Sequence, residues 1–434
     1  MKITVKGYKS ISSPISIDVN GLTVLSGANS SGKSSFMQPF LLMKQTIESN
    51  FDTGAILLDG ANAKLTDSSE ALSRTRKRNG QTFSVTLENS KSSSSITFKR
   101  HPDYGLVAES VSSRTLDLPQ GVVLRRGTKS DDIRKQLPKK YNDQFLKFLE
   151  KKSTDMEWQV VKEKCFLRAE IAPKKIGEQS LIRIGFNPSS SMENFVKNII
   201  HVPGLRGNPE RSYRLADSGD LYLGSFEPYV ASIVNKWKND PKQKIKFYQL
   251  VDDLKVLGLA SHISTERIND TRVEVRVSRY KGAPDGDSVN LADVGFGVSQ
   301  TLPVLVALLI ATEKQYVYIE QPELHLHPRA QHKMASIIAR AVSNGVKVII
   351  ETHSSILIRG IQTLVAKGKI PREKISLEWF NQDPVSGKSL VFTSKLDENG
   401  AFGEWPADFD ETSLMADSEY LDAVEESING KGQV

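Results

Sequence analysis

A loop of small residues near the start of the chain restricts the possible folds more than any other feature. Residues 27–34 read GANSSGKS, which fits the pattern G-x-x-x-x-G-K-[ST] without a mismatch. Leu22, Val24 and Leu25 precede the loop as a strand would, and an apolar stretch of helical length, residues 36–47, follows it. A strand, a glycine-rich loop and a helix in this order predict an α/β fold with a cradle for phosphate groups.

The chemistry of this phosphate loop follows from its residue types. Glycines let backbone N–H groups converge on phosphate oxygens, and the N-terminus of the next helix adds positive potential. Lys33 would reach the β- and γ-phosphates and the Ser34 hydroxyl would bind Mg²⁺, so ATP and Mg²⁺ are the expected cofactors. A glycine- and serine-rich turn at a helix start is the structural alternative. The residues expected to bind nucleotide are Gly27, Asn29, Ser30, Ser31, Gly32, Lys33, Ser34 and Ser35.

An apolar strand that ends in an acid lies late in the chain. Residues 315–320 read QYVYIE, and Gln321, Pro322 and Glu323 follow. Phosphate loops lie at the carboxyl edge of a parallel sheet, so Glu320 is predicted to hold Mg²⁺ there, directly or through water. A strand ending in an acid is common by itself. The phosphate loop favours the metal-binding interpretation because it needs such a partner.

A histidine follows the next apolar strand. Residues 346–351 read VKVIIE, and residues 331–342 between the two strands have a helical pattern. This strand–helix–strand unit predicts two parallel, buried strands. His353 would then reach a γ-phosphate at the same sheet edge, although a lone histidine is more often structural.

A second glycine pair, Gly295 and Gly297, precedes another helical stretch. With Ser299 and Gln300 it forms a candidate anion site at a helix N-terminus. A second phosphate site so far along the chain makes sense only if it serves another subunit's nucleotide. A buried helix with Ser299 near its N-cap explains the same residues equally well.

The remaining pattern mixes strands and helices. Alternation in residues 82–100 around a polar turn predicts a β-hairpin, and residues 273–277 predict another strand. Helices are predicted over residues 131–152 and over residues 244–257, with Gly258 as the stop of the second.

Length and composition narrow the class of protein. With 434 residues, 38% hydrophobic and 25% charged, the chain is expected to form two or three globular lobes. The longest apolar run is too short to span a bilayer, the first residues lack a signal-peptide core, and the single cysteine, Cys165, excludes an internal disulfide. These features predict a cytoplasmic protein with no membrane partner.

Charge is distributed unevenly. The formal net charge is +7, but residues 397–434 carry eleven acidic side chains and one basic one, so this tail carries −10 and the rest +17. A basic body suits nucleotides or nucleic acid, and the acidic tail suits a basic partner or merely favours solubility. The basic cluster Arg74, Arg76, Lys77 and Arg78 would contact a nucleic-acid backbone or form a solvated loop.

These motifs, in this order, resemble the ABC-type AAA ATPase heads of the SMC, RecF and overcoming-lysogenisation-defect group. GANSSGKSS resembles their Walker A loop, DVGFGVSQ their signature loop, IEQPELHLHP their Walker B segment and ETHSS their switch-histidine segment. Residues 397–411 are similar to a short C-terminal domain of unknown function carried by anti-phage defence ATPases. The resemblance covers most of the chain, but residues 55–290 match only in layout.

The resemblance implies an α/β P-loop NTPase with an ABC-type split head. A mixed β lobe would hold the Walker A loop, a parallel-sheet lobe would hold the later motifs, and an insertion without heptads should be a compact helical subdomain. Two heads would dimerise head to tail around two ATP molecules, or form a larger assembly. The implied divisions are residues 1–126 (first lobe), 127–289 (insertion and start of the second lobe), 290–390 (second lobe) and 391–434 (acidic C-terminal segment).

Two positions bear on the implied chemistry. The residue after the metal-binding acid is normally the general base, but here it is Gln321, and an amide cannot accept a proton, so hydrolysis should be slow. Glu323 or a histidine of residues 325–327 would substitute, or the protein binds ATP firmly and rarely hydrolyses it. Arg206 resembles an arginine loop that contacts nucleotide, and a surface arginine in a turn explains it as well.

Three functions remain open from the sequence. The resemblance favours an ATPase that senses or regulates for a separate effector, a nuclease or toxin, in bacterial anti-phage defence. The alternatives are a DNA-repair ATPase of the RecF/SMC type and a slowly hydrolysing ATP-dependent scaffold, which Gln321 favours. Trp405 and Phe409 in the acidic tail would dock on another protein or pack on their own head.

Overall fold

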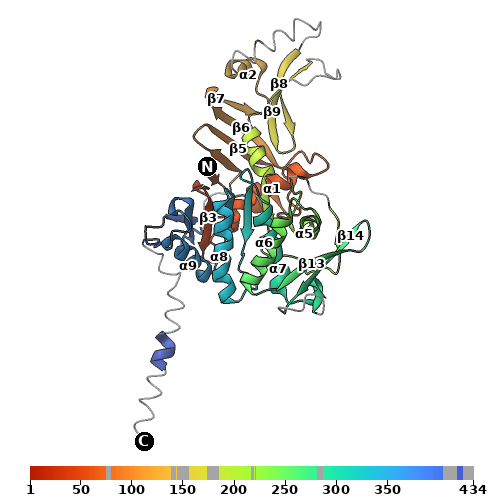
Figure 1. Ribbon diagram of the computed structural model, residues 1–434. Helices are drawn as coiled ribbons and strands as arrows, with labels where there is room; N and C mark the ends of the chain where they lie inside the picture. The colour runs from red at the N-terminus through yellow and green to blue at the C-terminus, as the bar shows by residue number, and fades with distance from the viewer. Residues whose placement is uncertain are drawn as a thin grey trace.

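The computed structural model in Figure 1 describes residues 1–74, 80–137, 143, 156–173, 185–216, 219, 221–280, 287–403 and 418–423. Two six-stranded sheets form its centre, and two smaller antiparallel sheets lie beside them. In Figure 1 one small sheet (β8 and β9) lies beyond the first large sheet, and the other (β13 and β14) lies beside the helices of the second.

The first sheet is antiparallel, with the strand order β2–β1–β4–β5–β6–β7. The hairpin predicted over residues 82–100 is confirmed, because β4 and β5 pair with Thr82 opposite Lys99. Alternate residues such as Val85 and Ile96 are buried on one face, as the period of two requires. The strands are β1 (Lys2–Lys6), β2 (Ile15–Asp18), β4 (Thr82–Glu88), β5 (Ser92–His101), β6 (Gly105–Thr115) and β7 (Leu118–Arg125).

The second sheet joins distant parts of the chain in the order β11–β16–β17–β3–β18–β19. The predicted parallel pairing of the two late strands is confirmed, with Glu320 opposite Glu351. All neighbouring pairs are parallel except β18 and β19. The strands are β3 (Leu22–Gly27), β11 (Ile199–Val202), β16 (Tyr316–Glu320), β17 (Lys347–Glu351), β18 (Ile375–Gln382) and β19 (Ser389–Ser394).

The position of β3 corrects one expectation. The phosphate loop was expected in the mixed β lobe, but β3 pairs with β17 and β18, in the parallel sheet. Every residue of β3 is buried, which suits a central strand covered on both faces and not a strand of a half-exposed antiparallel sheet.

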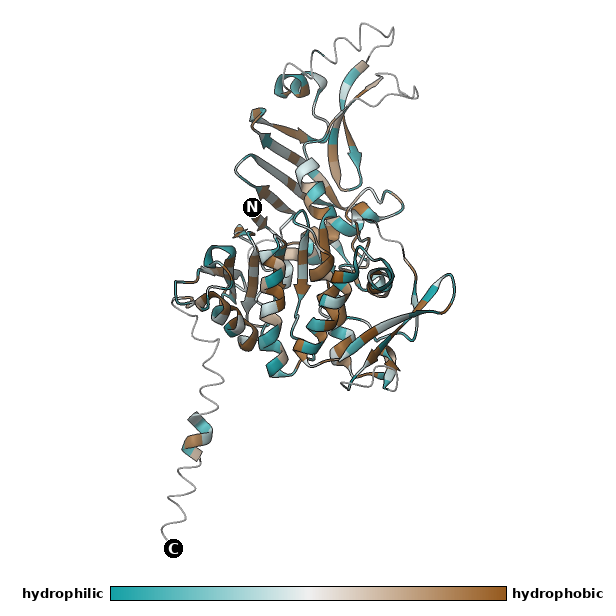
Figure 2. Ribbon diagram, viewed as in Figure 1, coloured by the Kyte–Doolittle hydropathy of each residue, from teal (hydrophilic) through white to brown (hydrophobic). Residues whose placement is uncertain are grey.

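Helices cover both faces of the second sheet. Val24 and Ile350 pack in one core with residues of α5–α9, whereas Leu25 and Ile349 pack in the other with α1, α4 and the first sheet. Figure 2 shows hydrophobic residues along the sheet strands and on the helix sides that face them. The helices are α1 (Lys33–Glu48), α4 (Ser190–Lys197), α5 (Val230–Asn239), α6 (Lys244–Leu257), α7 (Phe296–Ile310), α8 (Pro328–Ser343) and α9 (Ser355–Ala366).

The predicted helices of the second lobe are confirmed. Residues 244–257 form α6, which ends at Gly258 in the left-handed conformation with φ 70°. The helix predicted over residues 331–342 lies within α8, which begins earlier because Pro328 suits a first helical position. In the part of the chain that the structure describes, we find no helix with the length and apolar character needed to cross a bilayer.

The insertion contains more β structure than the sequence predicted. Of the helix expected over residues 131–152, the structure describes α2 (Ser130–Gln136), and most later positions of that prediction lie outside the described residues. β8 (Met156–Glu163), β9 (Phe166–Pro173) and β10 (Gly185–Phe186) then form a three-stranded antiparallel sheet. The expected helical subdomain is therefore wrong for these described residues, because buried Met156 and Trp158 alternate with more exposed neighbours, the period of a strand.

The last sheet and the short turns complete the described chain. The strand predicted over residues 273–277 is confirmed within β14 (Arg272–Ser278). Its sheet also contains β12 (Tyr213–Arg214), β13 (His262–Arg267) and β15 (Ser288–Asn290). Single 3₁₀ turns occur at Ser68–Ala71, Glu227–Tyr229, Leu291–Asp293 and Arg372–Lys374.

Gly27 at the end of β3 gives a test of this packing. Its φ is 134°, and a Cβ added there would lie 1.9 Å from the Phe380 carbonyl oxygen. Gly27→Ala is therefore expected to lower the free energy of unfolding by about 2 kcal/mol or more, as measured by urea denaturation. Gly207→Ala, where a Cβ meets nothing within 4 Å, is the control and should change it by less than about 1 kcal/mol. Equal losses in both variants would contradict this account of the sheet.

Candidate functional site

The phosphate loop takes the backbone shape that its glycines and serines predict. Gly32 caps α1 with φ 104°, and Ser30 also has a positive φ of 62°. A Cβ at Gly32 would lie 2.2 Å from the Ser389 hydroxyl oxygen, so only glycine fits against β19. The loop therefore turns sharply enough to direct the first N–H groups of α1 toward one point, where an anion is favoured.

Lys33 lies inside this turn. Its side chain is 4% exposed, and its Nζ donates to the carbonyl oxygens of Gly27 at 3.1 Å and Ala28 at 2.7 Å. Burial lowers the pKa of Lys33, and the nearby charge of Glu351 opposes that shift. The buried hydroxyl of Ser31 has no protein partner. A donor without a partner and an ammonium group held only by carbonyls fit a phosphate group.

Ser34 is hydrogen-bonded to the carboxylate of Glu351, which was not among the site residues predicted from the sequence. Its hydroxyl donates to Glu351 Oε1 at 2.7 Å, and the Tyr318 hydroxyl donates to Glu351 Oε2 at 3.0 Å. Burial raises the pKa of Glu351, which the hydrogen bond from Ser34 partly offsets. The sequence signal was present, because Glu351 ends an apolar strand just as Glu320 does.

Glu320 lies at the same edge, one strand further from the loop. His201 Nε2 lies 3.2 Å from Glu320 Oε1, and the Gly204 N–H donates to Oε2 at 3.0 Å. Burial disfavours the charged carboxylate, but the hydrogen bond from His201 and these other contacts leave its pKa below the usual value. Glu320 is thus a carboxylate held ready in its ionised form, and neither His201 nor Gly204 was selected from the sequence.

The oxygen donors at this edge fit Mg²⁺. Among the described residues, no group of three or more His, Cys, Asp or Glu side chains forms a metal cage. Mg²⁺ usually takes one or two carboxylates together with waters and phosphate oxygens. Ser34, Glu351 and Glu320 supply a hydroxyl and two carboxylates from neighbouring segments, which matches that preference.

Gln321 and Glu323 follow β16 in a tight turn. Gln321 has φ 46°, and its N–H donates to the Glu351 carbonyl oxygen at 2.7 Å. Glu323 accepts from the Thr352 hydroxyl at 2.7 Å and from the His353 N–H at 3.1 Å, while its other oxygen is buried without a protein partner. Burial raises the pKa of Glu323. The Glu323 carboxylate is therefore a stronger base than the Glu320 carboxylate, whose pKa is lowered. The hydrogen bond from the His353 N–H connects it to the next strand end.

The histidines of this region differ in their surroundings. His353 is exposed. Its pKa is lowered mainly by partial desolvation and also by the nearby positive charge of Lys33, which favours a neutral ring. His325 lies against Phe296 with ring centroids 5.7 Å apart, and His327 caps α8 by accepting from the Arg329 N–H. Of the three, His353 is the one whose pKa is affected by a charge of the phosphate loop, that of Lys33.

The signature segment begins α7 at Phe296, with Gly295 as its N-cap. Gly295 has no atom within 4 Å of a would-be Cβ, and Phe296 is 52% exposed. Ser299 donates to the Phe296 carbonyl, and Gln300 donates to the Arg206 and Gly207 carbonyls, so both side chains bond within their own head. The N-terminus of α7 is thus open, but these two side chains face inward.

Arg206 connects the signature helix to β16. It is 7% exposed, so the interpretation of a surface arginine is wrong. Its guanidinium donates to the carbonyl of Gln300 at 2.9 Å and to those of Glu320 and Gln321 at 2.8 and 3.3 Å. Burial lowers the pKa of Arg206 to about 10, which still leaves it charged at pH 7.

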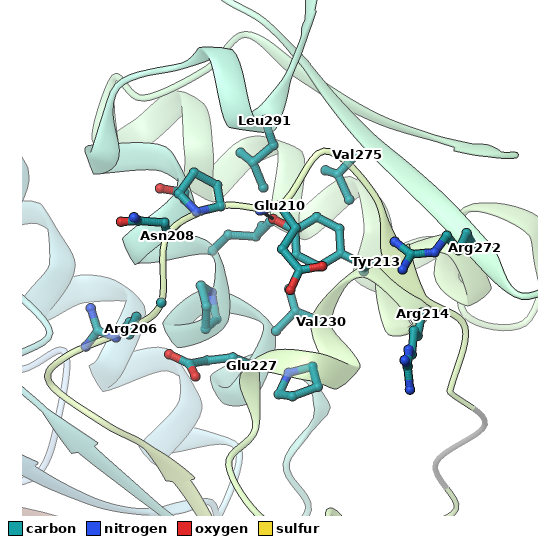
Figure 3. Close-up of a pocket in the computed structure, with 17 residues that line it drawn as sticks. Arg206, Asn208, Glu210, Tyr213, Arg214, Glu227, Val230, Arg272, Val275 and Leu291 are labelled. Atoms are coloured by element: carbon teal, nitrogen blue, oxygen red, sulfur yellow. Dashed lines mark hydrogen bonds between the residues drawn. The ribbon is translucent and has the colours of Figure 1, made fainter. Parts of the chain in front are cut away.

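A cavity of about 460 Å³ adjoins Arg206, as Figure 3 shows. Leu291, Ser299 and Leu302 contribute to its wall, together with Glu227 and Tyr213 from other segments. Burial raises the pKa of Glu227. The lining contains no residue of the phosphate loop, so this cavity is separate from the nucleotide edge.

Other predicted positions fall outside the described residues. These are Arg76, Lys77 and Arg78 of the basic cluster, and Trp405 and Phe409 of the acidic tail. Arg74, the described member of the cluster, donates to the Ser69 hydroxyl at 3.3 Å.

Arg206 supports a stability prediction. Arg206→Met keeps an unbranched apolar stem but removes the buried guanidinium and its hydrogen bonds to three carbonyl groups, so the free energy of unfolding should fall by about 3 kcal/mol in urea denaturation. Arg211→Met is the control, because the ion pair of Arg211 with Asp293 is largely exposed and should matter by less than about 1 kcal/mol. A small effect at Arg206 would show that water replaces its contacts.

One curated relative and two solved structures illustrate what the chain is similar to. A "Putative ABC transporter ATP-binding protein" of Listeria monocytogenes serotype 4b (strain F2365) is 27% identical over 122 residues, covering 27% of this chain and 43% of that protein. The chain thus matches less than half the length of that relative. An SMC head bound to the C-winged helix domain of ScpA has 12% identity and a TM-score of 0.42, covering 92% of this chain and 98% of the other. An SMC head derived from Pyrococcus furiosus, with an extended coiled coil and bound to the C-terminal domain of ScpA, has 10% identity and a TM-score of 0.42, covering 98% of both chains.

A family match covers the region that builds the site. Residues 22–359 match the family described as "AAA domain, putative AbiEii toxin, Type IV TA system". This span starts at the first residue of β3 and ends within α9, so it includes the phosphate loop, the signature helix and both acid-tipped strands. The chain therefore belongs to this family and has the fold of an ABC-type AAA ATPase.

Proposed function

We propose that the protein binds Mg²⁺ and ATP at the phosphate loop, closes a dimer of two heads around two nucleotides, and hydrolyses ATP slowly. The arrangement of Lys33 and Ser34 carries this proposal. Lys33 is buried within the loop, and Ser34 contacts a carboxylate at the end of the adjacent parallel strand. A single edge thus combines phosphate donors and magnesium ligands, as the ATPase family requires.

Each residue of the loop has a defined task in this proposal. Lys33 exchanges its bonds to two loop carbonyls for bonds to β- and γ-phosphate oxygens. Ser34 and, directly or through water, Glu320 would hold the metal, whose charge would offset that of the phosphates. The remaining loop residues, Gly27, Asn29, Ser30, Ser31, Gly32 and Ser35, line the phosphates with N–H and hydroxyl groups.

Proton transfer is assigned to the turn after β16. Gln321 occupies the position of the usual base and orients water without accepting its proton. Glu323, with a buried oxygen lacking a protein partner and a raised pKa, accepts the proton in its place. His353 contacts the γ-phosphate as a neutral donor. Because Glu323 lies two residues after the position of the usual base, we expect proton transfer, and therefore ATP hydrolysis, to be slow.

The second copy completes each site. The N-terminus of α7, which is open at Gly295 and packs against Leu259 and the His325 carbonyl at Gly297, would direct its N–H groups toward the partner's γ-phosphate. Ser299 and Gln300 support that helix end from within, since their hydrogen bonds stay in their own head. The exposed ring of Phe296 lies beside this point and suits burial in a dimer.

The dimer would act as a sensor or regulator for a separate effector, a nuclease or toxin, in bacterial anti-phage defence. The family description, which names a toxin of type IV toxin–antitoxin systems, supports this class. The acidic residues of segment 391–434 would bind a basic partner. In this proposal the ATPase lobes are residues 1–126 and 290–390, and residues 127–289 contain the insertion.

Removing the loop ammonium tests nucleotide binding. Lys33→Ala should weaken binding of ATP with Mg²⁺ by about tenfold or more in calorimetry, because a charge-assisted contact to phosphate is lost. ATP should then no longer shift the mass in light scattering from one copy to two. Lys99→Ala, which removes an exposed lysine of β5, should leave both measurements unchanged. Wild-type protein that binds no ATP would refute the proposal.

Restoring the missing carboxylate tests the slow step. Gln321→Glu should raise the rate of ATP hydrolysis by about 10- to 100-fold, since it places a base where water is attacked. Glu323→Gln should lower the wild-type rate, and its effect should be smaller in the Gln321→Glu background. If neither change alters turnover while ATP still drives dimerisation, the protein is a nucleotide-dependent scaffold.

A further inference from the structure

The order of strands at the nucleotide edge places Glu351 closer to the phosphate loop than Glu320. β17 pairs directly with β3, whereas β16 lies on the other side of β17, between β17 and β11. Neighbouring strands lie about 4.8 Å apart. The carboxylate at the end of β17 is therefore one strand from the loop, and Glu320 is two strands from it.

The side-chain contacts of Glu351 agree with this order. One carboxylate oxygen accepts from Ser34 at 2.7 Å and the other from Tyr318 at 3.0 Å. Glu351 is 6% exposed, and Tyr318 is fully buried and stacked on His201, with ring centroids 5.4 Å apart. The N–H of Gln321 fixes the Glu351 backbone as well. Glu351 is thus held rigidly against the hydroxyl that binds Mg²⁺ in loops of this kind.

Glu320 is engaged on the opposite side. Its two oxygens contact His201 Nε2 at 3.2 Å and the Gly204 N–H at 3.0 Å. His201 is held in turn by Asn62 at 3.1 Å. The hydrogen bonds of Glu320 thus go to His201 and Gly204, whereas Glu351 contacts Ser34 directly, so Glu351 is the acid placed beside a metal at Ser34.

We propose that Glu351 is the carboxylate nearest the Mg²⁺ ion and holds it together with Ser34, while Glu320 acts from the next strand through water. This inference rests on the proposed function, because it concerns the metal that accompanies ATP. Mg²⁺ retains several waters and accepts one or two carboxylates, so an inner and an outer acid are compatible with its octahedral shell. The two acids that this inference assigns to the metal, Glu351 and Glu320, both end strands.

Glu351→Gln tests this assignment with little risk to the fold. The amide keeps the size of the side chain and an oxygen that accepts from Ser34, but it removes the negative charge. ATP binding is measured by calorimetry in MgCl₂ and again in EDTA, and Mn²⁺ binding in the presence of ATP is followed by electron paramagnetic resonance. We expect ATP affinity in EDTA to stay within about twofold of wild type, and the gain from Mg²⁺ and the affinity for Mn²⁺ to fall by about tenfold or more.

Glu378→Gln is the matched control. Glu378 is also a buried acid, but it lies on β18, on the other side of β3, and accepts from Thr393. This variant should keep the full gain in affinity from Mg²⁺. Glu320→Gln should reduce that gain less than Glu351→Gln, because a ligand that acts through water contributes less.

Three outcomes would overturn the inference. An unchanged Mg²⁺ dependence in Glu351→Gln would show that another group holds the metal. An equal loss of affinity in MgCl₂ and EDTA would show that Glu351 only supports the loop. Wild-type protein that binds no ATP in either buffer would reject the proposed function itself and this inference with it.

Discussion

The backbone hydrogen bonds that hold β3 between β17 and β18 determine the geometry of the sheet edge that carries the phosphate loop. β3 comes from the first residues of the chain, and its neighbours come from the last hundred. Because all three strands are parallel, their carboxyl ends meet at one edge, and Ser34 of the loop contacts Glu351, which is 317 residues away in the sequence. The close approach of Gly27 to Phe380 shows how tightly this pairing is packed.

Buried polar groups then connect the strand ends with one another. Tyr318, from the middle of β16, donates to Glu351 on the neighbouring strand, and His201, from β11, contacts Glu320. Each of the two carboxylates, Glu320 and Glu351, accepts at least one hydrogen bond, which offsets part of the free-energy cost of removing it from water. Hydrogen bonds within the protein therefore fix the positions of the carboxylates at this edge.

Local patterns predicted the parts of this structure that depend on neighbours in sequence. The phosphate loop, α6 with its stop at Gly258, and the parallel strands around α8 follow from periodicity and turn residues. The insertion was predicted poorly, because an apolar recurrence in residues 131–152 outweighed the alternation that follows it. The burial of Arg206 was not predicted because its partners are backbone carbonyls 94 and 114 residues away. Every residue has a backbone carbonyl, so the sequence does not indicate which of them an arginine contacts.

The burial of Arg206 has a consequence for communication between the two edges of a head. A planar guanidinium bonded to the carbonyls of Gln300 and Glu320 is stiff, so it transmits displacement instead of absorbing it. In the dimer that we propose, a displacement of the N-terminal part of α7 would reach the end of β16 through this side chain. Contact at one face of a head would thereby alter, in the dimer we propose, the position of the strand end that carries Glu320.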